Sequence, residues 1–327
     1  MYIDNSKCYQ FLGDYSGDIS KCKNMILAGG AAMSVTFLSL FKILKERNIH
    51  KNIKNILGLS AGALMALFFI FNFTEEEVIN IATTYDYESV ADITVDNIIN
   101  FTTKKGVDSV EKHILKIRNM FKDKCEDVNK ITFKYIYERF GINLIIVITN
   151  IMSYQAEYYD YYNSPEVDVF DILKCTIAFP FYFEPVEYNG NLYIDGAFYN
   201  NLPLDYFEDN PKYNIDETFS IIANHPILKI NSTNIEDISM GSYFHLLYTL
   251  SRYNIDKLKK YNKYIIHLCL HNDKITSFKH NITLDELKDV LNISYVEIKK
   301  QLEHADNYQK KIKILKQNKN NSKQNKK

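Results

Sequence analysis

The segment Gly58-Leu59-Ser60-Ala61-Gly62 has the Gly-x-Ser-x-Gly form that can expose a serine hydroxyl for nucleophilic chemistry. Such a serine occupies a sharp turn between a strand and a helix, and a bulky side chain at either glycine would collide across the turn. The N-terminal dipole of the following helix favours negative charge that develops at the serine. We therefore expect Gly58 and Gly62 to form a nucleophile elbow around Ser60, the alternative being a chance Gly/Ser turn.

A second segment, Leu27-Ala28-Gly29-Gly30-Ala31-Ala32, follows a predicted strand and opens a predicted helix. The backbone N–H groups of Gly29, Gly30, Ala31 and Ala32 can form an anion-binding nest aimed at a tetrahedral intermediate. A phosphate-binding loop is excluded, because no Gly-Lys-Ser/Thr follows and no GxGxxG is present. By itself the segment is equally compatible with a helix that packs tightly on a strand.

Asp195 is the candidate base. It follows Tyr193-Ile194 and precedes Gly196-Ala197, which places it where a predicted strand ends. An ordinary aspartate is a weak base toward serine. Asp195 could serve only if it were partly desolvated and hydrogen-bonded directly to the serine hydroxyl. In isolation, Asp-Gly usually marks a turn.

The remaining pattern predicts an α/β fold, because strands alternate with helices. Strands are expected over 25–28, 53–57, 143–149, 155–159, 192–194, 219–223 and 264–270. Helices are expected over 34–48 and 61–71, after a capping box at Thr74 and Glu77, from Asp108, from Ser164 toward Cys175, and after Thr283.

Two uncharged stretches, 24–41 and 55–74, are long enough to raise the question of a membrane span. Each carries glycines that divide a short strand from a helix. Consecutive strand-turn-helix units favour the buried core of a parallel sheet over a spanning helix. We therefore expect no transmembrane helix.

Composition excludes several classes of protein. The net charge of -1 gives no general attraction to nucleic acid. The five cysteines are scattered without a CxxC pair, which argues against a zinc knuckle or a disulfide framework and favours a reduced, intracellular (cytoplasmic) setting. The N-terminus lacks the order of charged and apolar residues typical of a secretory signal.

The chain divides by composition into an extension over 1–24, one domain over 25–315 and a basic tail over 316–327. The tail consists of Lys, Asn, Gln and one Ser, which predicts disorder. It either keeps the protein solvated and soluble or binds anionic lipid through its lysines, and the solubilising role is favoured.

Together these segments resemble the patatin-like phospholipase family, over about Met25 to Asp205. Four motifs in order carry the resemblance: the glycine loop and helix of 29–44, the elbow of 58–62, the segment 176–186, and Asp195-Gly196-Ala197 with Asn200-Asn201-Leu202-Pro203. The resemblance implies a three-layer α/β/α sandwich with a mostly parallel sheet, a Ser60–Asp195 dyad without histidine, and no metal or other cofactor. It also implies hydrolysis of phospholipid or neutral-lipid acyl esters through an acyl-serine, with peripheral membrane contact.

The resemblance further implies that the N–H groups of Gly30 and Ala31 are the main oxyanion donors, flanked by Gly29 and Ala32. Ala31 replaces the third glycine of the family's loop, and it is tolerated if its φ is negative. Met33 stands where the family has Lys or Arg, which removes a contact with lipid phosphate or with the loop. Ser34 replaces the glycine that follows.

Alternatives remain open. An α/β-hydrolase triad could recruit a later histidine: His225, His245, His267 or His271. An inactive patatin-like binding module is the non-enzymatic alternative. Phe179, Phe181 and Phe183 are candidates for lipid contact, and 90–106 is a candidate lid. The oligomeric state stays open.

Overall fold

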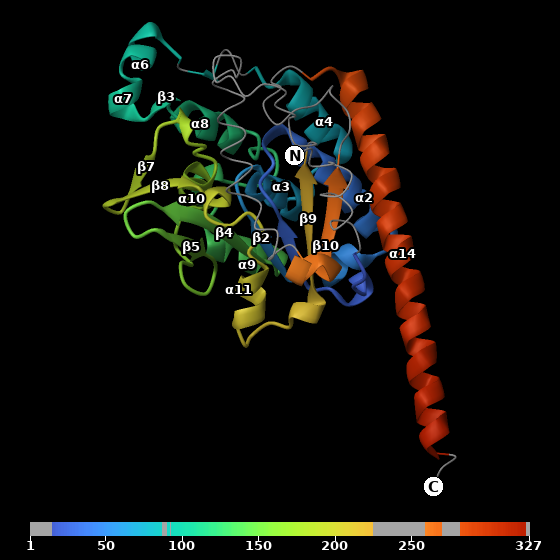
Figure 1. Cartoon of the computed structure of the whole chain (residues 1–327). Coiled ribbons are helices and arrows are strands. Elements are labelled where there is room, and N and C mark those ends of the chain that lie inside the picture. Colours follow the sequence, from blue (N-terminus) through green and yellow to red (C-terminus); the bar gives the residue numbers. More distant parts are fainter. Residues whose placement is uncertain (1–14, 87–89, 92, 225–258, 270–281, 325–327) are drawn as a thin grey trace, which may run out of the picture.

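The computed structural model describes residues 15–86, 90–91, 93–224, 259–269 and 282–324, in which a central sheet lies between helices (Figure 1). The strands of the central sheet are β1 (Asn24–Leu27), β2 (Asn55–Gly58), β4 (Asn143–Asn150), β5 (Gln155–Tyr159), β7 (Val186–Tyr188), β8 (Asn191–Asp195), β9 (Thr218–Asn224) and β10 (Ile265–Cys269). A separate two-stranded sheet is formed by β3 (Gly106–Asp108) and β6 (Phe181–Phe183).

The α-helices of the described ranges differ widely in length. They are α2 (Phe37–Glu46), α3 (Ala61–Ile70), α4 (Glu75–Thr84), α6 (Val95–Ile99), α7 (Phe101–Lys104), α8 (Glu111–Asn119), α9 (Phe133–Phe140), α10 (Val169–Thr176), α11 (Leu204–Asp209) and α14 (Leu284–Gln324). The short 3₁₀ helix η2 (Ala31–Thr36) leads into α2, so the predicted helix over 34–48 begins as a tighter turn.

The central sheet has the strand order β10-β9-β1-β2-β4-β8-β7, with β5 paired to β4. The pairs from β10 to β4 are parallel, whereas β5, β8 and β7 pair antiparallel. The predicted α/β/α arrangement with a mostly parallel sheet is confirmed.

The register on β4 brings two strand ends together. β5 lines one edge of β4 without a break, from Ile146 to Asn150. On the other edge, β2 ends with Gly58 opposite Ile146, and β8 ends with Asp195 opposite Ile148. Because β2 runs parallel and β8 antiparallel to β4, their carboxyl ends approach each other head-on along the same edge.

Side chains of the sheet alternate between two buried clusters. Met25 and Leu27 pack toward α2, α3, α10 and α14, whereas Ile26 packs on the opposite face with residues of α11. Strands buried on both faces read as continuous apolar runs, which explains the uncharged stretches of the sequence. No helix of the described residues is both long and apolar enough to cross a bilayer.

Two predicted helix starts were wrong. Asp108 ends β3, where it pairs with Phe183 of β6, so α8 begins only at Glu111. The helix expected from Ser164 begins at Val169, because the Asp168 side chain accepts from the Phe170 N–H at 2.7 Å and so forms the N-terminal cap. The capping box at Thr74 and Glu77 is present in both directions.

The long helix α14 packs on α2 and β10 with its first half and then extends away from the body (Figure 1). Ile298, Leu302 and Ala305 are buried in that first half. The helix continues through residues 316–324, which composition had assigned to a disordered tail. A helix already nucleated by packing extends at little cost through lysine and glutamine.

The two halves of α14 should contribute unequally to stability. Leu302→Ala is expected to lower the free energy of unfolding by about 2–5 kcal/mol, since it empties a buried site. Deleting residues 316–327 should change it by less than about 0.5 kcal/mol, because Lys316, Gln317 and Asn318 are exposed. Urea denaturation measures both, and a deletion costing as much as Leu302→Ala would contradict this assignment.

Candidate active site

Ser60 lies in a strained turn between β2 and α3. Its φ of 51° and ψ of −134° fall in a region that non-glycine residues rarely adopt. A Cβ on Gly62 would lie 2.2 Å from the Leu27 carbonyl oxygen, and one on Gly58 would lie 2.5 Å from the Ala63 Cα. The turn can therefore form only because both flanking positions lack a side chain.

Asp195 accepts a hydrogen bond from the Ser60 hydroxyl. The Ser60 Oγ donates to Asp195 Oδ2 at 2.5 Å, and the Ala197 N–H donates to Asp195 Oδ1 at 2.8 Å. Asp195 is 1% exposed and Ser60 is 8% exposed. The desolvation and the direct hydrogen bond that a serine–aspartate dyad requires are both present.

Thr176, at the end of α10, braces the serine turn. Its Oγ1 accepts from the Ser60 N–H at 2.9 Å and donates to the Val147 carbonyl at 2.5 Å. Sequence reasoning assigned no role to this residue, although it opens the segment 176–186 that contributed to the family resemblance. Burial raises the pKa of the neighbouring Cys175 thiol to about 12, which keeps that thiol protonated near neutral pH.

The glycine loop is tied to the segment after Asp195. The Gly29 N–H donates to Asn201 Oδ1 at 2.8 Å, and the Asn201 amide returns a bond to the Gly29 carbonyl at 3.3 Å. The Gly29 N–H is thus engaged by a side chain from 172 residues away. In the sequence Asn201 stood out only as part of the motif of 200–203, and nothing there indicated this link.

The backbone at Ala31 is in the left-handed region. Its φ is +48°, so the condition under which alanine is tolerated without strain, a negative φ, is not met, and the strain costs about 1–3 kcal/mol. Within the described ranges, no acceptor takes a hydrogen bond from the N–H groups of Gly30, Ala31 or Ala32. Ala31 and Ala32 line the cavity that holds Ser60, whereas the Met33 side chain is buried in the core.

Ser34 carries a polar atom without a partner. Its Oγ is buried and has no hydrogen bond within the described part of the chain. The residue lines the same cavity as Ser60, and its Oγ is the nearest atom to a Cβ built on Gly30, at 2.9 Å. A buried hydroxyl without a hydrogen bond lowers the free energy of unfolding.

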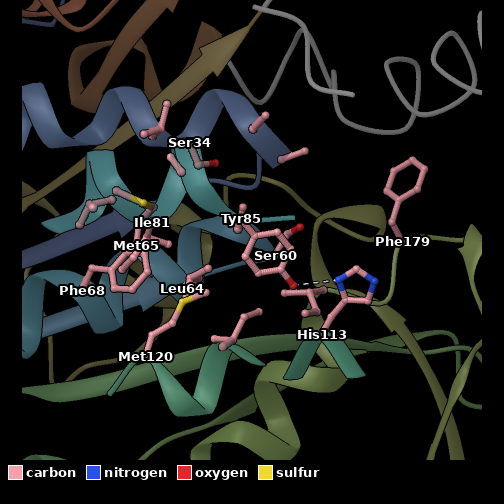
Figure 2. Close-up of a pocket in the computed structure, with 18 of the residues that line it drawn as sticks. Ser34, Ser60, Leu64, Met65, Phe68, Ile81, Tyr85, His113, Met120 and Phe179 are labelled. Carbon is pink, nitrogen blue, oxygen red and sulfur yellow. Dashed lines mark hydrogen bonds between the residues drawn. The ribbon is translucent and has the colours of Figure 1, made fainter. Parts of the chain in front are cut away.

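An apolar cavity of about 270 Å³ opens beside the dyad (Figure 2). Its size is near the lower end of small-molecule sites. Aliphatic, thioether and aromatic side chains form most of its wall, among them Leu64, Met65, Phe68, Ile81, Met120 and Phe179. Phe183 also lines it, whereas Phe181 is exposed on the surface. The structure thus separates the three phenylalanines that sequence reasoning grouped.

One polar cluster interrupts this apolar wall. Tyr85 lies 3.0 Å through its hydroxyl from His113 Nδ1, and His113 Nε2 lies 3.0 Å from Asp108 Oδ2 (Figure 2). Tyr85 and His113 line the cavity, and Asp108 is fully buried behind them. No sequence signal pointed to His113, because its partners come from different elements.

Of the late histidines considered for a triad, the structure describes only His267, and it does not lie at the site. His267 lies on β10, where its backbone is bonded to the Gln301 side chain, and it does not line the cavity. His225, His245 and His271 lie outside the described residues. Over the described ranges, no group of three or more His, Cys, Asp or Glu side chains has metal-binding geometry.

Known proteins are similar to this chain. The sequence profile of the patatin-like phospholipases matches residues 25–208, more than half of the chain, and includes the loop, the elbow and Asp195. The chain belongs to the patatin-like phospholipase family. Membership in this family supports lipid hydrolase activity.

Two viral proteins are similar in sequence. The probable lipid hydrolase 463L of Invertebrate iridescent virus 6 is 26% identical over 257 residues, which cover 74% of this chain and 86% of that protein. The uncharacterized protein R571 of Acanthamoeba polyphaga mimivirus is 27% identical over 208 residues, covering 63% of this chain and 67% of that protein.

Among solved structures, VipD from Legionella pneumophila has the same fold. It superposes with a TM-score of 0.53 over 88% of this chain and 67% of VipD, at 16% sequence identity. The two proteins therefore share the fold although their sequences have diverged widely.

Thr176→Val should destabilise the protein by about 1–3 kcal/mol, because the nearly isosteric change leaves the buried Ser60 N–H without an acceptor. Thr84→Val is the matched control, since Thr84 is exposed and its hydroxyl bonds to the Asn80 carbonyl of its own helix. Thermal and urea unfolding of both variants test this, and equal effects would contradict the bracing role.

Ser34→Ala should raise the free energy of unfolding by about 1 kcal/mol, because it removes a buried hydroxyl that has no partner in the described chain. Ser39→Ala should lower it by a similar amount, since the buried Ser39 Oγ donates to the Leu291 carbonyl at 2.8 Å. Urea denaturation of the pair measures the difference, and a loss of stability in Ser34→Ala would refute the unsatisfied state.

Proposed function

We propose that this chain hydrolyses acyl esters of phospholipids or neutral lipids, with Ser60 as nucleophile and Asp195 as its base. The observation that supports this most is the 2.5 Å hydrogen bond from Ser60 Oγ to the buried Asp195 carboxylate. It lies at one end of an apolar cavity in a chain of a lipid hydrolase family. A hydroxyl, a base and an apolar binding space are the parts that lipid acyl transfer needs.

In the first step, Ser60 Oγ attacks the ester carbonyl carbon while its proton passes to Asp195 Oδ2. The tetrahedral intermediate collapses as the bond to the alcohol oxygen breaks. Asp195 returns the proton to that oxygen, which leaves as the free alcohol or lysolipid. The acyl group remains esterified to Ser60.

In the second step, water replaces the alcohol. Asp195 takes a proton from the water as its oxygen attacks the acyl carbonyl carbon. The bond to Ser60 Oγ then breaks, the proton returns to Ser60, and the fatty acid leaves. Asp195 thus serves as base and acid in turn, and its Oδ1 bond from the Ala197 N–H holds the carboxylate in place.

The oxyanion would be stabilised by the N–H groups of Gly30, Ala31 and Ala32. None of the three is committed to an acceptor in the described chain, and Ala31 is held at a positive φ beside the cavity. A donor of this kind contributes about 3 kcal/mol to catalysis. Gly29 would act differently, as the anchor of the loop through Asn201.

Ser60→Ala should reduce fatty-acid release from phospholipid vesicles by about 10⁶-fold, to the background rate, because the nucleophile is lost. Asp195→Asn should reduce kcat by about 10²–10⁴-fold, since the amide cannot take the proton. Fatty acid is quantified by mass spectrometry, and a fluorophosphonate probe reports the reactive serine separately.

Ser153→Ala is the matched control, because Ser153 is exposed on a turn between β4 and β5. It should retain full activity and labelling. If the probe labels the wild type but no lipid releases fatty acid, Ser60 is reactive and the substrate is another kind of ester. Release that persists in Ser60→Ala would overturn the mechanism, and absence of both labelling and release would favour the binding module.

A further inference from the structure

Exposed apolar side chains gather around α6. Val95 is 73% exposed, Ile99 70% and Ile98 58%, and Ile93 and Phe181 are exposed beside them. We call these five residues the α6 patch. Such a close group of exposed aliphatic side chains is uncommon on protein surfaces and is typical of an interaction site.

The α6 patch is attached to the wall of the cavity. Lys104 of α7 is paired with Glu184 at 3.0 Å, and β3, which follows α7, pairs with β6. Phe101 of α7 contacts the ring of Phe181. β3 ends at Asp108, which bonds His113 of the cavity wall.

The patch also lies at the end of the molecule where Ser60 lies. In Figure 1, α6 and α7 stand at the top, the end toward which the parallel strands β9 and β10 point. Ser60 follows the carboxyl end of β2, which is parallel to them. A flat surface that touched α6 would therefore face the same end of the sheet as the catalytic serine.

The charges of this segment nearly cancel. Lys104 pairs with Glu184, while Asp96 and Lys105 are exposed nearby with opposite signs. Phe181 is held at a φ of 71°, a strained conformation for an aromatic residue, and the residue is 42% exposed. A neutral surface with aliphatic and aromatic side chains matches the interfacial region of a lipid bilayer, with no requirement for anionic lipid.

We propose that the α6 patch inserts into the surface of a lipid bilayer and orients the cavity toward its substrate. The proposal rests on the proposed lipid hydrolysis for its purpose, but the insertion can be measured without any turnover. The lysine-rich end of α14 is a poor candidate for this contact, because in Figure 1 it extends away from the end of the sheet that carries Ser60.

The chain contains no tryptophan, so a single introduced tryptophan reports its own surroundings. We would place Ile99→Trp in the Ser60→Ala background and add phosphatidylcholine vesicles. The expected result is a blue shift and quenching by lipids that carry a quencher in the acyl region. Leu315→Trp on α14 is the matched control, since Leu315 is 62% exposed, and it should show neither.

Binding through an apolar, neutral surface should depend little on salt between about 0.1 and 1 M. Ile98→Asp combined with Ile99→Asp should weaken vesicle partitioning by at least about tenfold. Ile293→Asp, at an exposed isoleucine of α14, should leave it unchanged. Circular dichroism and thermal unfolding of the three proteins show that the variants are folded.

The outcomes separate the surface from the chemistry. Absence of a fluorescence shift in the Ile99→Trp protein, or binding that needs anionic vesicles and vanishes in salt, would overturn the proposal. A shift that grows with protein concentration in the absence of vesicles would assign the patch to a second protein copy and overturn it as well. If the wild type hydrolyses esters, the double variant should lose activity on vesicles and keep it on a short, water-soluble ester.

Discussion

The hydrogen bond between Ser60 and Asp195 depends on the pairing of both β2 and β8 with the central strand β4. Two strands of opposite direction use the same edge of β4 and meet end to end, with Gly58 opposite Ile146 and Asp195 opposite Ile148. Residues 135 positions apart in the chain are thereby brought to 2.5 Å. In the proposed dyad no third residue would orient the base as in a triad, so the strand register and the Ala197 N–H supply that orientation.

Close backbone packing maintains this geometry. Gly196 admits no Cβ because the Val147 carbonyl would lie 2.1 Å away, and the same carbonyl accepts from Thr176, which in turn holds the Ser60 N–H. The strained backbone of Ser60 is therefore surrounded by contacts that over-determine it. Strain of this kind persists only where the neighbouring structure enforces it, and it leaves the hydroxyl facing the cavity.

The cavity and the surface around it suit an apolar substrate in different ways. Inside, the wall is mostly apolar, and beyond Ser34 and the Ser60–Asp195 pair its polar groups include Tyr85 and His113, which are hydrogen-bonded to each other and to Asp108 behind them. Outside, β3 and β6 connect the wall to the exposed α6 patch. The Met33 side chain is buried in the core, whereas Ala31 and Ala32 of the same loop line the cavity.

The sequence by itself determined the local parts of the site. Glycines at 58 and 62 predicted the turn at Ser60, although only Gly58 is required by the turn itself, at Ala63, whereas Gly62 is required by close packing against Leu27 of β1. Buried strands were visible as uncharged runs. Helix starts at Asp108 and Ser164 were misplaced, because Asp108 is held in a strand by pairing with Phe183, far along the chain, and a better cap lay at Asp168. The sign of φ at Ala31 was likewise beyond local inference. Only the tertiary structure decided that Asn201 anchors Gly29, that Thr176 supports Ser60 and that His113 lines the cavity. These contacts join elements distant in the chain, and strand register, which no local pattern encodes, determines which of them meet.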